Sequence, residues 1–125
     1  MKILHTCVLA ICTFALVGCD ESAIEREADA IRDNTQQEAE TIRDLSQSAA
    51  EATRDASQNA AETIREGVDK APDGIQDAGE QRADALEEIG EKKADQLESK
   101  GEKKADSVEE LGEAKADAIE ETDDK

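Results

Sequence analysis

Small and apolar residues recur every eleven residues through the second half of the chain, with a spacing of three, four and four. The stripe consists of Ala83, Leu86, Gly90, Ala94, Leu97, Gly101, Ala105, Val108, Gly112, Ala116 and Ile119. Eleven residues make three helical turns with about 20° left over, so such a stripe stays on one helix face with a slight right-handed drift. Nothing alternates with period two, which excludes a strand. We predict a long helix over residues 75–122.

The first half of the chain has its own 11-residue repeat, with copies at 39–49, 50–60 and 61–71 and a degenerate copy that starts at Ala28. In each copy an acidic residue stands three positions before an arginine. These pairs are Asp29/Arg32, Glu40/Arg43, Glu51/Arg54 and Glu62/Arg65. Residues three apart are neighbours on a helix, so we expect ion pairs within this helix.

The ends of the two predicted helices are marked by local signals. Ser22 is followed three residues later by Glu25, the capping-box pattern of a helix N-terminus. Pro72-Asp73-Gly74 stands between the two repeats and predicts a hinge, because proline cannot continue a helix and Asp-Gly is turn chemistry. Asp73 together with Gln76 could also cap the second helix.

These patterns predict an all-α protein of two long helices. The two repeat blocks are similar in length, so they can fold back as an antiparallel hairpin; an extended rod and a partly disordered chain remain alternatives. Each glycine of the stripe weakens its helix by about 1 kcal/mol relative to alanine. Their regular placement on the apolar face predicts that another helix packs closely there.

Large apolar residues are too few for a monomeric globule, because burying them cannot offset the entropy of ordering about a hundred residues. After residue 18 they number 13 and none is aromatic: Ile24, Ile31, Ile42, Leu45, Ile64, Val68, Ile75, Leu86, Ile89, Leu97, Val108, Leu111 and Ile119.

The charge of the chain is strongly acidic. Residues 19–125 hold all 33 acidic residues and 14 of the 15 basic ones, a net side-chain charge of −19. Such a surface repels nucleic acid and anionic lipid headgroups. Both predicted helices are acidic, so we expect repulsion to oppose their pairing and added salt to stabilise the hairpin.

The N-terminal segment has one basic residue, Lys2, and then a mostly apolar run that ends in Leu16-Val17-Gly18-Cys19. The run is too short to span a bilayer comfortably. This segment resembles the lipobox of bacterial lipoproteins. The resemblance implies a lipid on Cys19, cleavage before it, and a membrane-tethered chain outside the cytoplasmic membrane. An ordinary secretory signal and an uncleaved anchor helix are the alternatives.

Asp20 resembles the signal that keeps enterobacterial lipoproteins in the inner membrane, so we expect the chain to stay there in a cell with two membranes. Lys125 is similar to the terminal lysine through which the major outer-membrane lipoprotein is joined to peptidoglycan. Because Asp123-Asp124 departs from that family's ending, we interpret Lys125 as a chance lysine in the tail. The predicted organisation is a signal peptide (1–18), a lipid anchor with the first helical block (19–71), a turn (72–74), a second helical block (75–122) and a frayed tail (123–125).

Residues for chemistry are scarce after the predicted cleavage site. The only histidine, His5, lies in the signal, together with Cys7 and Cys12. Carboxylate pairs such as Glu87/Glu88 catalyse only when burial separates their pKa values, and this chain offers no means of burying them. We expect no enzyme activity, cofactor, metal site or small-molecule substrate.

The repeats resemble the 11-residue repeats of late-embryogenesis-abundant proteins and, more loosely, exchangeable apolipoproteins. The first predicted function is a structural or interaction lipoprotein that holds an acidic helical surface near the membrane, for self-association or for a helical protein partner. The alternative, implied by this resemblance, is a stress-protective chain that is helical only when dried, crowded or bound.

Overall fold

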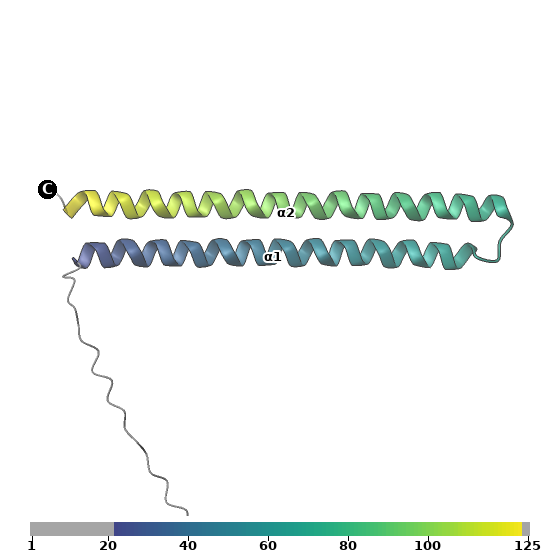
Figure 1. Ribbon diagram of the computed structural model, residues 1–125, viewed down its shortest axis with the longest axis horizontal. Coiled ribbons are helices and arrows are strands. Elements are labelled where there is room, and N and C mark those ends of the chain that lie inside the picture. Colours follow the sequence, from purple (N-terminus) through teal and green to yellow (C-terminus); the bar gives the residue numbers. More distant parts are fainter. Residues whose placement is uncertain (1–21, 124–125) are drawn as a thin grey trace, which may run out of the picture.

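The computed structural model describes residues 22–123, which form two long antiparallel helices (Figure 1). Helix α1 runs over Ala23–Val68 and helix α2 over Asp73–Asp123. The two helices lie side by side along their length, and the described range holds no strand. The predictions of an all-α fold and of a helical hairpin are therefore confirmed, and the extended rod is not formed.

Several predicted features lie outside the described residues. They are the signal peptide at 1–18, the lipid site Cys19, the sorting residue Asp20, and the last two residues of the tail, Asp124 and Lys125.

The predicted start of α1 is confirmed in detail. Ser22 is the N-cap residue, and its Oγ accepts a hydrogen bond of 3.0 Å from the Glu25 backbone N–H. In return, the Glu25 carboxylate accepts a hydrogen bond of 2.7 Å from the Ser22 N–H. This reciprocal pair satisfies two backbone donors that the first helical turn leaves without partners. Helix α1 therefore has a defined N-terminus close to residue 19.

The connection between the helices covers residues 69–72 and comes slightly earlier than predicted. Pro72 belongs to it, but Asp73 and Gly74 are already the first residues of α2. The Pro72 carbonyl accepts from the backbone N–H groups of Ile75 and Gln76 at 2.7 and 3.1 Å, which starts the new helix. Proline is tolerated there because a helix start needs no N–H from that position.

The predicted cap by Asp73 and Gln76 takes a different form. The Gln76 amide donates a hydrogen bond of 2.7 Å to the Asp69 carbonyl at the end of α1. The side chain thus satisfies a carbonyl of the helix it faces rather than a donor of its own helix.

The hairpin core consists of alanine methyl groups. Eight alanines have no exposed surface and recur every eleven residues: Ala28, Ala39, Ala50 and Ala61 in α1, and Ala83, Ala94, Ala105 and Ala116 in α2. No larger side chain of the described residues is fully buried. A core of methyl groups lets the two backbones approach closely.

The glycines of the stripe lie where α2 comes closest to α1. A Cβ atom at Gly90, Gly101 or Gly112 would collide with Ser57, Ser46 or Thr35, respectively. At Gly101 that Cβ would also lie 3.8 Å from the Ile42 carbonyl oxygen. The prediction that these glycines permit close helix packing is confirmed.

Candidate functional site

Four arginines of α1 reach across the hairpin, and each binds three acidic residues of α2. We call this set the arginine ladder. Its four clusters are Arg32 with Glu113, Asp117 and Glu120; Arg43 with Glu102, Asp106 and Glu109; Arg54 with Glu91, Asp95 and Glu98; and Arg65 with Glu80, Asp84 and Glu87.

The ladder exists because the two repeats have the same period and run in opposite directions. Each step of eleven residues forward in α1 meets a step of eleven backward in α2, so one cluster is repeated four times. Sliding one helix along the other by a few residues would disrupt all four clusters together. The ladder therefore holds the helices in one register.

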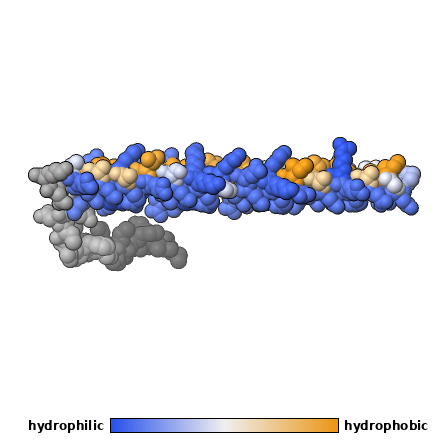
Figure 2. All heavy atoms as spheres, turned by 90° about the horizontal axis from the view of Figure 1, so that it is seen from above, coloured by the Kyte–Doolittle hydropathy of each residue, from blue (hydrophilic) through white to orange (hydrophobic). Residues whose placement is uncertain are grey.

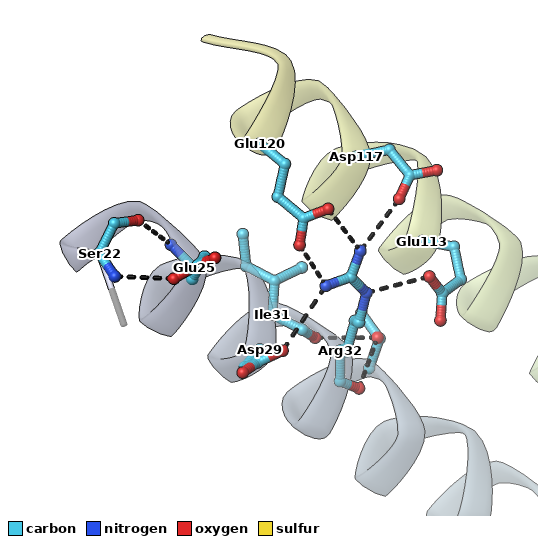
Figure 3. A network of polar contacts seen from close by, with 9 residues as sticks. Ser22, Glu25, Asp29, Ile31, Arg32, Glu113, Asp117 and Glu120 are labelled. Carbon is cyan, nitrogen blue, oxygen red and sulfur yellow. Dashed lines mark hydrogen bonds and ion pairs between the residues drawn. The ribbon is translucent and has the colours of Figure 1, made fainter. Parts of the chain in front are cut away.

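The cluster at the open end of the hairpin shows how one guanidinium serves three carboxylates (Figure 3). Arg32 Nε donates to Glu113 at 3.1 Å, and Nη2 donates to Asp117 at 3.0 Å. Nη1 and Nη2 donate to the two oxygens of Glu120 at 2.6 and 3.2 Å. The planar guanidinium provides donors along three edges, which the ammonium group of lysine does not.

The arginines are much less exposed than most of their partners. The side chain of Arg32 is 27% exposed, whereas that of Asp117 is 66% exposed. Hydrogen bonds from the arginines lower the pKa values of Glu87, Glu98, Glu109 and Glu120, and partial desolvation opposes this shift. The same bonds raise the pKa values of the four arginines.

The prediction of ion pairs within α1 is wrong for three of its four pairs. Of the four predicted pairs within α1, only Asp29/Arg32 is formed, at 3.6 Å, because the arginines turn toward α2 instead. On this face the α2 acids meet arginines of α1 rather than other acids. The stabilisation of the hairpin by added salt stays a prediction. The sequence held a signal for these acids, since each α2 repeat places Glu, Asp and Glu at the same three positions.

The lowered pKa of Glu98 predicts a pH-dependent effect of Glu98→Gln. A carboxylate with a lowered pKa in the folded state adds stability above its unfolded pKa and loses it as the pH falls through the folded value. At pH 7 we expect Glu98→Gln to melt below the native chain. The two melting temperatures should converge as the pH falls below the ordinary glutamate pKa of about 4.3 and then through the lower pKa of the folded Glu98.

Thermal unfolding followed by circular dichroism between pH 3 and 7 measures this difference. Glu110→Gln is the matched control, because Glu110 is exposed and forms no ion pair within residues 22–123. A Glu98→Gln deficit that does not shrink at all between pH 7 and the acid end of the range would contradict an ionic role for Glu98.

The side of the hairpin opposite the arginine ladder is apolar. In α1 an isoleucine directly precedes Arg32, Arg43 and Arg65, so it lies about 100° around the helix axis from the arginine. The buried alanine of the same repeat lies between the two, so the isoleucine and the arginine face opposite sides of the hairpin. We define the apolar face by its large residues: Ile24, Ile31, Ile42, Leu45, Ile64, Ile75, Leu86, Ile89, Leu97, Val108, Leu111 and Ile119.

Figure 2 shows the hairpin edge-on, with hydrophobic residues gathered along one edge and hydrophilic residues along the other. Much of the apolar face is open to solvent: Leu45 is 66% exposed and Leu111 is 60% exposed. The alanine core leaves these residues only partly covered.

The space between neighbouring ladder clusters is an open depression, lined for example by Arg54, Arg65 and Glu91. Within residues 22–123, no carboxylates are grouped to hold a metal ion, and no buried side-chain nitrogen or oxygen lacks a hydrogen-bond partner. Neither described helix is apolar enough to cross a membrane.

Comparison with protein-family models, with curated proteins and with solved structures found no match.

Proposed function

We propose that this chain is a non-enzymatic lipoprotein of the bacterial cell envelope, which holds a helical hairpin with an acidic surface beside the membrane. The observation that carries the proposal is the arginine ladder. Four equivalent clusters fix two helices in one register, which is typical of a structural or interaction element. Helix α2, with 51 residues, is about 75 Å long at 1.5 Å per residue.

The ladder face remains acidic after its arginines are bound, because each arginine meets three carboxylates. Most of these partners are well exposed, as Asp84 and Asp95 are at 69% and 70%. They can accept further hydrogen bonds from a basic partner in solution. A helical protein partner or another copy of this chain would meet a regular row of carboxylates with an 11-residue repeat.

The membrane tether is the lipid proposed on Cys19. Only Asp20 and Glu21 separate Cys19 from the N-cap Ser22, so a lipid at Cys19 would keep the start of α1 within a few residues of the bilayer. The proposed location is the outer face of the cytoplasmic membrane, or the periplasmic side in a cell with two membranes.

Cys19→Ser tests the tether in the full chain. We expect the substituted protein to lose the mobility shift that lipidation causes and to stop partitioning into detergent. Separation of inner and outer membranes in the same experiment, with Asp20→Ser as a second variant, tests the predicted inner-membrane location. A Cys19→Ser protein that partitions into detergent with an unchanged mature mass would contradict the proposal.

A further inference from the structure

Five of the seven basic residues of α2 lie on a different side of the helix from its ladder acids. Arg82, Lys93, Lys104 and Lys115 each stand four positions before an apolar-face residue: Leu86, Leu97, Val108 and Ile119, respectively. Residues four apart share a helix face, so this row runs along the apolar face. Lys100 joins it, because it occupies the repeat position of Ile89 and Leu111. We call these five residues the basic row.

The basic row is available for a partner. All five side chains are exposed. Within residues 22–123 the one lysine in an ion pair is Lys92, which binds Glu88 away from this row. The ladder acids point to the opposite side of the hairpin, where the arginines bind them.

Acidic residues are few beside the apolar face. By the same four-residue spacing, Glu27 and Glu38 accompany Ile31 and Ile42 near the open end of α1. The apolar face is thus accompanied by five basic residues and two acidic ones, although the whole chain carries a net charge of −18. One face of this acidic protein is therefore both apolar and cationic.

We propose that the apolar face and its basic row dock on an anionic phospholipid surface. The leucine and isoleucine side chains would enter the boundary between headgroups and acyl chains, and the lysines would extend to the phosphates. The acidic face points away from the lipid across a helix roughly 10–12 Å thick. This exceeds the screening length of about 8 Å at physiological salt, so its repulsion is weak at the membrane.

Charge decides between a lipid surface and a second copy of the chain. The face measures roughly 70 by 20 Å, so a dimer could bury on the order of 1,400 Å² per copy, which exceeds the ~800 Å² of a standard interface. A second copy, however, would bring the same basic row, with only Glu27 and Glu38 as counter-charges. An anionic bilayer supplies both an apolar layer and a dense array of negative charge.

The proposal rests on the proposed function for its placement at a membrane, but docking itself does not require lipid on Cys19. It is therefore tested with residues 22–123 alone. This segment contains the capping box, the connection, the alanine core and all four ladder clusters, so the hairpin is complete without the residues before Ser22. Circular dichroism checks that it is helical before each binding measurement.

Cosedimentation with vesicles measures the docking. We expect at least tenfold tighter binding to phosphatidylglycerol-containing vesicles than to phosphatidylcholine vesicles, and weaker binding at 0.5 M salt. The variant Lys93→Gln/Lys104→Gln/Lys115→Gln should lose at least tenfold in affinity for the anionic vesicles, and Leu45→Gln/Leu111→Gln should lose a similar amount. The control Lys70→Gln/Lys92→Gln/Lys103→Gln removes the same charge away from the apolar face and should bind like the native segment.

Three results would overturn the proposal: no binding of the native segment to anionic vesicles, equal losses in the two triple-lysine variants, or a stable dimer in sedimentation equilibrium that Leu45→Gln/Leu111→Gln dissociates. The last result would make a second copy the occupant. If the segment fails to bind while Cys19→Ser still releases the full chain, docking fails and the tether stands. If the segment binds while the Cys19→Ser chain keeps the mobility shift of lipidation, docking stands and the tether fails.

Discussion

Replacement of all four ladder arginines by glutamine is expected to open the hairpin at neutral pH. Each substitution leaves three carboxylates of α2 without their cation, beside the acidic residues of α1 that lie three positions before each arginine. Attraction across the interface thereby becomes repulsion at four places. The alanine core offers little hydrophobic burial to resist this change.

Distances between spin labels at Glu27→Cys and Thr122→Cys in residues 22–123, which contain no other cysteine, measure the opening. The native segment should give a single short distance, and the four-arginine variant a long or broad distribution. Arg82→Gln is the single-site control, because Arg82 is exposed and forms no ion pair within the described range. A short, narrow distance in the four-arginine variant would show that the ladder is not needed to close the hairpin.

Replacement of each ladder arginine by lysine separates charge from geometry. The positive charge remains, but a lysine ammonium cannot direct parallel donors to three carboxylates as the guanidinium does. We expect the lysine variant to melt between the native segment and the glutamine variant.

The same circular dichroism measurements test the stress-protective alternative. If the native segment itself were a coil in water that becomes helical only in alcohol or on drying, that alternative would replace the proposed function.

Gly101→Ala is expected to destabilise the hairpin, whereas Gly67→Ala should stabilise it. Alanine favours a helix over glycine by roughly 1 kcal/mol. A Cβ at Gly67 meets nothing within 4 Å, so this gain is retained there, reduced by the position near the end of α1. At Gly101 the same atom collides with Ser46, and overpacking of this kind costs about 1–3 kcal/mol.

A reciprocal exchange tests whether the collision is the cause. Ser46→Gly alone should lower stability by roughly 0.5–1 kcal/mol, because it places a glycine inside α1. Combined with Gly101→Ala, it removes the hydroxymethyl group that the new methyl strikes, so the double variant should be more stable than Gly101→Ala. Thermal unfolding of the four proteins gives the coupling energy. Additive losses would show that Ser46 is not what makes glycine necessary at position 101.

Composition alone misjudged the electrostatics of this protein. A charge of −19 over residues 19–125 suggests repulsion everywhere, yet the ladder arginines and their α2 acids lie on one side of the hairpin, and the basic row lies along the other. An average over the chain cannot distinguish these two faces. The helical period places the acidic and basic residues on different sides of a helix. It does not tell which side packs against the other helix and which side is open to a partner.

Local signals in the sequence were sufficient to predict the two helices and where they begin and end. The Ser22–Glu25 capping box, the proline between the blocks and the 11-residue period each act over a few residues, so they could be interpreted without knowledge of the fold. The glycine positions on the stripe of α2 likewise predicted a close neighbour. These features were confirmed, apart from the boundaries of the connection, where Asp73 and Gly74 already belong to α2.

Tertiary structure decided which charges meet. Arg43 could bind Glu40 within its own helix or carboxylates elsewhere, and local spacing favours the near partner. Only the antiparallel register brings Glu102, Asp106 and Glu109 around the same guanidinium, more than fifty residues away in sequence. That register follows from two repeats of equal period packed through alanine and glycine. The same packing leaves the apolar face and its basic row open to solvent, which the spacing within α2 alone could not show.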